Sequence, residues 1–247
     1  MTDYNKQIIL FDLDDTLVHC NRYFNVVLDQ FADEMLSYFN GQGLTAEEIL
    51  ERQIEIDLAG TAKHGFLPEK FPDSLVETYQ HYCEQFGRPE VKDEIDFLNK
   101  LGFSAYSFPI EPYPDMIETL QTLQEAGHTL CLYTGGDVSI QMRKVDDTGI
   151  GKFFEDRIFI TLHKNTEFLR YIIETQEFDR SRTWMIGNSV RTDIMPALDN
   201  GIHAIQMIPE IEWAYNLVEN TSTPKGAFYI VNDLKEVPVK INEYLSS

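Results

Sequence analysis

The chain has 247 residues, of which 43% are hydrophobic and 25% charged, and this composition excludes a wholly disordered, collagen-like or coiled-coil protein. Its formal net charge of −21 disfavours nucleic acid and anionic membranes, so we expect neither as a partner. The three cysteines form no CxxC pair, and their odd number argues against a disulfide framework. We therefore expect a reduced, cytoplasmic compartment.

The first predicted element is a short buried strand at residues 8–11, and a long helical stretch follows it. Apolar residues recur at helical spacing between residues 18 and 111, and no segment there has the pattern of a strand. Glycine and proline residues divide this stretch into helices expected at 23–39, 46–58, 74–86 and 90–101. We interpret residues 18–111 as an inserted, all-helical domain.

The rest of the chain alternates between short apolar runs and amphipathic segments. Strands are expected at 130–133, 158–160, 184–186, 204–207 and 228–231, and helices at 114–126, 166–175, 193–199 and 232–245. Nearly continuous hydrophobicity is typical of a strand that is covered on both faces, as in a parallel sheet. Residues 1–17 and 112–247 are therefore predicted to form an α/β domain with a doubly wound, mainly parallel sheet.

Two acidic residues follow the first predicted strand, in the run Asp12-Leu13-Asp14-Asp15-Thr16. Residues two apart in an extended chain point the same way, so the carboxylates of Asp12 and Asp14 are expected on one face. Adjacent carboxylates repel each other unless a cation neutralises one or a proton stays on the other. An aspartate beside a divalent metal can act as a nucleophile, and a protonated neighbour as a general acid. The plain alternative is an acidic turn after a strand.

Three later loops carry the other polar groups of this predicted site. One strand ends in Thr134-Gly135-Gly136, which can present a hydroxyl and backbone N–H groups to an oxyanion. Another ends in Gly187-Asn188-Ser189, followed by Asp193, and offers oxygen ligands suited to a hard cation. Lys164 lies on the intervening loop. Each group alone is explained by a turn or a surface position, but together they predict a phosphate and metal site.

In this order and spacing, the motifs resemble those of the haloacid dehalogenase superfamily, in particular its phosphatase branch. The DxDxT motif is at residues 12–16, the hydroxyl after the second strand is Thr134, the lysine is Lys164, and residues 187–193 approximate GDx₃₋₄D. The resemblance covers residues 1–17 and about 112–208. It implies a Rossmann-like core, with residues 18–111 in the position of the helical cap between the first and second motifs.

The resemblance also implies a reaction and a role for each residue. The reaction is hydrolysis of a small phosphomonoester, in which Asp12 attacks phosphorus and forms an aspartyl-phosphate. Asp14 protonates the leaving oxygen and then activates water. Thr134 and Lys164 bind the transferring phosphoryl group, with Gly135 as a further substrate contact. The implied cofactor is Mg²⁺, held by Asp12, the backbone carbonyl of Asp14, Asn188 and Asp193.

One position departs from the family pattern, because Asn188 stands where the first aspartate of the fourth motif is usual. Asparagine offers one neutral oxygen in place of a carboxylate, so we expect Asp193 to be the main carboxylate ligand. Dehalogenases of the superfamily lack the second aspartate of the first motif. The presence of Asp14 therefore argues against dehalogenation.

The inserted stretch narrows the expected substrate class. Residues 18–111 hold 17 acidic and seven basic residues, which suits a small phosphomonoester better than a polyanion. Asn21 and Arg22, next to the first motif, are candidates for substrate binding, although ordinary helix-start positions are the plain alternative. Two other functions stay open: phosphoglucomutase-type phosphoryl transfer and a non-catalytic binding module on the same fold. The sequence names neither the substrate nor the oligomeric state.

Overall fold

The computed structural model describes residues 5–246, and the chain divides into two compact units. One unit holds the chain up to Cys20 and from Ile110 onward, and the other is Asn21–Pro109. These boundaries lie two or three residues from those expected at 17/18 and 111/112. The reason is local pairing, because Val18 forms β-bridges with Asp14 and Pro112. We call the two units the α/β unit and the helical unit.

The α/β unit is built on a six-stranded sheet in which every neighbouring pair is parallel. Its strands are β1 (Ile8–Phe11), β2 (Thr129–Gly135), β3 (Ile158–Thr161), β4 (Thr183–Gly187), β5 (His203–Met207) and β6 (Phe228–Val231). The spatial order is β3-β2-β1-β4-β5-β6, which puts β1 between β2 and β4. The expected mainly parallel sheet is confirmed, and it is parallel throughout the described residues.

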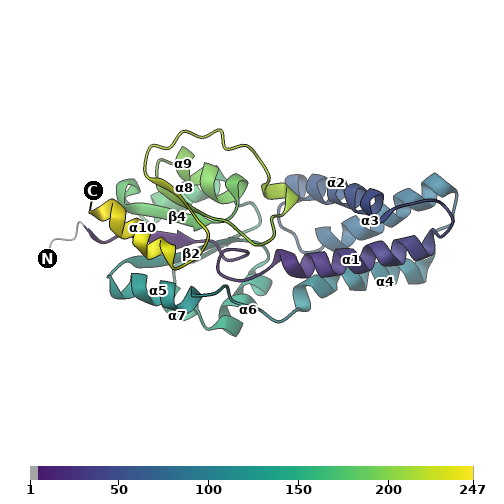
Figure 1. The fold of residues 1–247 in the computed structure, drawn as a ribbon, viewed down its shortest axis with the longest axis horizontal. Helices are drawn as coiled ribbons and strands as arrows, with labels where there is room; N and C mark the ends of the chain where they lie inside the picture. Colours follow the sequence, from purple (N-terminus) through teal and green to yellow (C-terminus); the bar gives the residue numbers. More distant parts are fainter. Residues whose placement is uncertain (1–4, 247) are drawn as a thin grey trace. The chain divides into compact units, whose positions relative to one another are not determined.

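Helices cover both faces of this sheet (Figure 1). They are α5 (Met116–Glu125), α6 (Val138–Thr148), α7 (Gly151–Phe154), α8 (Thr166–Thr175), α9 (Met195–Asp199) and α10 (Glu236–Leu245). Ile9 and Phe11 of β1 pack in one apolar cluster with α5, α7 and α10, whereas Leu10 packs in a second cluster with α8 and α9. Alternate residues of a strand point to opposite faces, so a continuous apolar run fills both layers. The doubly wound α/β class is confirmed.

Two helices of this unit were not among the elements expected from the sequence. Helices α6 and α7 lie between β2 and β3, where no helix was predicted. The Asp137 side chain caps α6 by accepting hydrogen bonds from Ser139 N at 2.8 Å and Ile140 N at 3.2 Å. Few residues of α6 are buried and apolar, since Gln141 and Lys144 are buried beside Val145. The segment is therefore more polar than the helices that the sequence predicted.

The helical unit contains four helices around one apolar core. They are α1 (Asn21–Tyr38), α2 (Ala46–His64), α3 (Lys70–Phe86) and α4 (Lys92–Ser104), followed by a 3₁₀ turn at Ala105–Ser107. Thr45 begins α2 with a reciprocal capping box to Glu48. Helix α3 begins four residues earlier than expected, because Pro72 lies in its first turn, where a missing N–H costs no helical hydrogen bond. No helix among residues 5–246 has the length and apolar character needed to cross a membrane.

Helices α3 and α4 approach closely at Gly102. A Cβ atom at Gly102 would lie 2.6 Å from the Cα of Pro72, which is backbone and has little freedom to move. We expect Gly102→Ala to lower the free energy of unfolding by about 1–3 kcal/mol, as overpacking does elsewhere. Gly60→Ala is the matched control, because a Cβ there meets nothing closer than the Lys70 side chain at 3.9 Å. Urea unfolding of both variants tests this, and equal stability for the two would contradict it.

Candidate active site

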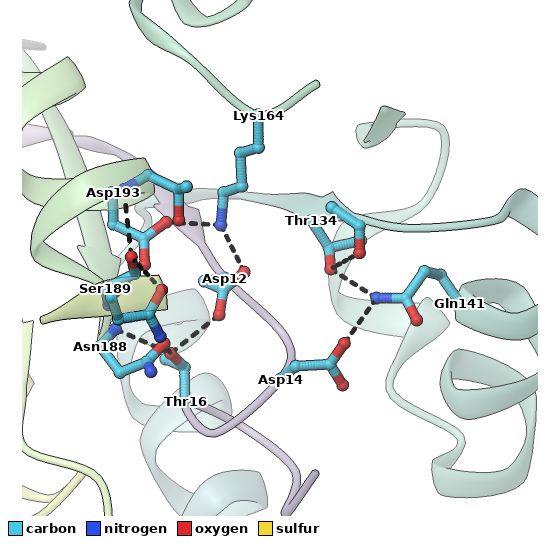
Figure 2. Close-up of polar contacts among 12 residues, drawn as sticks. Asp12, Asp14, Thr16, Thr134, Gln141, Lys164, Asn188, Ser189 and Asp193 are labelled. Atoms are coloured by element: carbon cyan, nitrogen blue, oxygen red, sulfur yellow. Dashed lines mark hydrogen bonds and ion pairs between the residues drawn. The ribbon is translucent and has the colours of Figure 1, made fainter. Parts of the chain in front are cut away.

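The predicted site residues of the α/β unit converge at one edge of its sheet. Asp12 directly follows β1, and Thr134 is the penultimate residue of β2. Lys164 follows β3, and Asn188 directly follows β4. The strands are parallel and β1 is central, so their carboxyl ends meet at this edge. Figure 2 shows Asp12 between Lys164 and Thr16.

Asp12 is held on both of its carboxylate oxygens. Lys164 Nζ donates to Oδ1, and Thr16 Oγ1 donates to Oδ2 at 3.1 Å. The backbone N–H of Asp12 donates to the carbonyl of Ile186 at 2.8 Å, which continues the β1–β4 pairing. Burial raises the pKa of Asp12 to about 7, with Lys164 opposing the shift and Asp193 adding to it. The carboxylate is therefore fixed in position and poorly hydrated.

The Lys164 ammonium is shared between two buried carboxylates. Its Nζ contacts Asp12 and lies 2.5 Å from Asp193 Oδ1, and the three side chains are almost fully buried. Burial lowers the pKa of Lys164, but the charges of Asp12 and Asp193 outweigh it and hold the pKa above its usual value. Burial likewise raises the pKa of Asp193, with Lys164 working in the opposite direction. One ammonium group thus lies between two carboxyl groups, and their raised pKa values show that this buried cluster favours a proton or a further cation.

Asp193 reaches the cluster from a π-helical turn at Val190–Ile194, where a regular helix was expected from residue 193. The turn is fixed by Ser189, whose backbone N–H donates to Asp193 Oδ2 at 2.9 Å. Gly187 makes room for this side chain, because a Cβ atom there would lie 2.3 Å from Asp193 Oδ2. The glycine of the fourth motif is therefore required by packing against Asp193.

Asn188 is tied to the first motif through Thr16. Its backbone N–H donates to Thr16 Oγ1 at 3.1 Å, and its side-chain oxygen lies 3.4 Å from the same hydroxyl. Asn188 is buried, and Thr16 also bonds Asp12. The threonine of the first motif thereby joins the predicted nucleophile to the fourth motif.

Asp14 points away from Asp12, toward helix α6 (Figure 2). Its Oδ1 lies 2.6 Å from Lys144 Nζ, and its Oδ2 accepts from Gln141 Nε2 at 3.0 Å. Gln141 Nε2 also donates to Thr134 Oγ1 at 2.6 Å. Sequence reasoning missed both α6 residues. In the sequence, only their i, i+3 spacing after the second motif indicated a shared role, because this spacing places both residues on one face of a helix.

The three predicted substrate contacts belong to two different units of the chain. Gly135 ends β2 directly after Thr134, so it lies at the same sheet edge. Asn21 and Arg22 are the first two residues of α1 and belong to the helical unit, whereas the cluster described above lies wholly within the α/β unit. Their part in substrate binding stays a prediction.

The donor atoms at this edge fit a hard divalent cation. Within residues 5–246 no three His, Cys, Asp or Glu side chains form a metal-binding group. The cluster nevertheless offers two carboxylates, from Asp12 and Asp193, with the amide of Asn188 and the backbone carbonyl of Asp14 nearby in the chain. Carboxylate, amide and carbonyl oxygens are the ligands that Mg²⁺ prefers, and it is bound through only one or two carboxylates at many phosphate sites.

The chain is similar to known proteins over most of its length. The family model for haloacid dehalogenase-like hydrolases matches residues 6–201, which is most of the chain. The chain belongs to this family. The chain is also 26% identical over 240 residues to a glyceraldehyde 3-phosphate phosphatase of Methanocaldococcus jannaschii, covering 93% of this chain and 94% of that protein. It is 25% identical over 243 residues to a phosphoglycolate phosphatase of Vibrio parahaemolyticus, covering 96% of each.

Solved structures support the fold of this haloacid dehalogenase-like hydrolase. The crystal structure of a haloacid dehalogenase-like family hydrolase from Xanthomonas campestris superposes with a TM-score of 0.75, at 20% identity, over 97% of this chain and 96% of that one. The predicted superfamily and the predicted enzyme class, a phosphatase hydrolase, are confirmed.

Proposed function

We propose that this hydrolase removes the phosphoryl group from a small phosphomonoester through an aspartyl-phosphate on Asp12, with Mg²⁺ as cofactor. The observation that carries the proposal is the buried Asp12 carboxylate at the tip of the central strand, with Lys164 and Thr16 fixing its oxygens. Three curated relatives are named for phosphates of small metabolites, which supports a substrate of this class.

Bound Mg²⁺ would supply positive charge that neutralises the phosphate of the substrate, which the acidic protein otherwise repels. Asp12, Asn188, Asp193 and the carbonyl of Asp14 would hold it. The protein contributes one further cation at the same edge, the Lys164 ammonium. Phosphoryl transfer depends mostly on positioning and charge stabilisation, and Lys164 together with bound Mg²⁺ would supply the positive charge that it requires.

In the first step, an Asp12 carboxylate oxygen bonds to phosphorus while the bond from phosphorus to the leaving oxygen breaks. Asp14 gives its proton to that leaving oxygen, and the alcohol departs. The Thr134 hydroxyl and Lys164 bind the oxygens of the transferring group. In the second step, ionised Asp14 takes a proton from water, whose oxygen attacks phosphorus. The bond to Asp12 breaks, and inorganic phosphate leaves.

The helical unit is proposed to select the substrate, as the cap of this hydrolase. Asn21 and Arg22 begin its first helix directly after the first motif and are proposed as substrate contacts. The acidic balance of residues 18–111 opposes long polyanions, which supports a small phosphomonoester as substrate.

Phosphate release from a panel of phosphomonoesters tests this function. The panel includes phosphoglycolate, glyceraldehyde 3-phosphate, sugar phosphates and p-nitrophenyl phosphate, each with Mg²⁺ and with chelator. We expect release that depends on Mg²⁺ and is fastest for one small metabolite. Interconversion of sugar phosphates without free phosphate would indicate a mutase, and the absence of both from folded protein would indicate a binding module.

Gly187→Ala probes the geometry of the site without removing a polar group. The new Cβ displaces Asp193, with which it would clash. We expect phosphate release to fall by about 10²-fold, since a shift of about 1 Å at an active site has effects of this size. Gly60→Ala, in the helical unit, should retain full release. If Gly187→Ala released phosphate as fast as wild type, activity would not depend on the observed position of the Asp193 side chain.

A further inference from the structure

Two buried side chains of α6 contact Asp14 and have no role in the steps above. Lys144 is 8% exposed and Gln141 is 1% exposed, which is unusual for residues of these types. Lys144 Nζ lies 2.6 Å from Asp14 Oδ1, and Gln141 Nε2 donates to Oδ2 at 3.0 Å. Each oxygen of the Asp14 carboxylate thus has its own donor from one helix.

The local structure aims both donors at the same place. Gln141 and Lys144 are three residues apart, so they lie on one face of α6. The Asp137 cap fixes where this helix begins. Gly136, at φ +136°, leaves room for Gln141, because a Cβ atom there would lie 3.2 Å from the Gln141 side chain. This backbone conformation strongly favours glycine.

Gln141 also reaches the phosphate-binding threonine. Its amide nitrogen carries two hydrogens, and it donates to Thr134 Oγ1 at 2.6 Å as well as to Asp14. The Thr134 oxygen therefore acts as an acceptor toward Gln141. Thr134 Oγ1 lies 3.5 Å from the carbonyl oxygen of Gly135, which is a long hydrogen bond, so the hydroxyl hydrogen is available to a phosphoryl oxygen.

We propose that Gln141 and Lys144 are positioning residues for the general acid–base Asp14, and that Gln141 also orients the hydroxyl of Thr134. The inference rests on the proposed function, because it concerns the proton that Asp14 gives to the leaving group. Lys144 contacts Asp14 but not Thr134, whereas Gln141 contacts both. The two residues should therefore have separable effects.

Dependence on the leaving group distinguishes positioning from a merely structural role. An alkyl leaving group departs as a strong base and needs the Asp14 proton, whereas p-nitrophenolate departs without one. The ratio kcat/KM includes the steps up to departure of the leaving group. A misplaced Asp14 should thus lower kcat/KM for an alkyl phosphomonoester and leave that for p-nitrophenyl phosphate nearly unchanged. A general loss of folding would lower both equally.

The experiment measures both kcat/KM values, using the alkyl phosphomonoester that the panel ranks first. For Lys144→Met we expect about a 10²-fold loss with the alkyl substrate and a loss within about threefold with p-nitrophenyl phosphate. Lys144→Arg should restore part of the alkyl activity. Gln141→Leu should lose activity on both substrates and bind the competitive inhibitor inorganic phosphate more weakly. Arg143→Met, which removes a half-exposed cation from the same helix, is the control and should resemble wild type.

Equal losses on the two substrates, or no loss, in folded Lys144→Met would overturn the proposal. If Lys144→Met does not fold, Lys144→Arg takes its place, since a guanidinium keeps the charge but not its position, and the same unequal loss is expected at smaller size. A wild-type enzyme that releases phosphate from neither substrate would instead refute the proposed function. The two failures are distinguishable. If wild type is active but the variants lose equal activity on both substrates, only the positioning role is refuted.

Discussion

Asp12→Asn is expected to abolish phosphate release, with a loss of at least about 10⁴-fold, because an amide oxygen is a far weaker nucleophile than a carboxylate. The substitution keeps the shape of the side chain, and an amide oxygen can still accept from Lys164. Folding should survive, since burial already makes the charged form of Asp12 unfavourable. The measurement is phosphate release by purified variant and wild type, with Mg²⁺ present.

The stability of this variant has a predictable dependence on pH. The folded state raises the pKa of Asp12 from 3.8 to about 7, so folded wild type binds a proton more tightly than the unfolded chain. Wild type therefore loses stability as pH rises through that interval, and Asp12→Asn does not. In chelator, the free energy of unfolding of the variant should therefore rise relative to that of wild type as the pH increases from about 4 to about 7. A variant that releases phosphate at near the wild-type rate would contradict the role of Asp12.

Lys164→Met should have the largest effect on stability. It leaves the Asp12 and Asp193 carboxylates buried without their shared cation. Removing one partner from a buried ion pair destabilises proteins by about 3–5 kcal/mol, so we expect a loss in this range, measured by urea unfolding in chelator. Phosphate release should also fall sharply, because the transferring group loses a positive contact. Lys152→Met removes an exposed lysine and should change stability by no more than about 0.5 kcal/mol.

The same variant reports on the proposed cation site. With Lys164 absent, the two carboxylates attract a divalent cation more strongly. Mg²⁺ should therefore raise the Tm of Lys164→Met by more than it raises that of wild type. Full wild-type stability of Lys164→Met in chelator would show that the buried cluster is not held together by this lysine.

The sheet could be predicted because each strand is a short apolar run whose alternate residues fill two layers, as Leu10 and Phe11 do. The residues at its carboxyl edge followed from the same pattern, since Asp12, Thr134 and Asn188 come at strand ends. Helix α6 could not be found in this way. Its inner face carries Gln141 and Lys144, and a helix whose buried residues are mostly polar lacks the apolar stripe by which the other helices were predicted.

Tertiary contacts explain what else the sequence left open. The π-helical turn at Val190–Ile194 depends on Ser189 capping and on the space at Gly187, neither of which has a local pattern. The direction of the Asp14 side chain depends on a helix some 130 residues later in the chain. Spacing along a strand predicted one shared face for Asp12 and Asp14, but the chain turns after β1 and the two carboxylates have different partners.

Trapping the covalent intermediate identifies the nucleophile directly. Enzyme mixed with its best substrate is quenched in acid and reduced with borohydride, which converts an aspartyl-phosphate to homoserine. Peptide mass spectrometry then locates the reduced residue. We expect homoserine at position 12, dependent on substrate and absent from Asp12→Asn. Reduction at another aspartate, or none during active turnover, would contradict a phosphorylated Asp12.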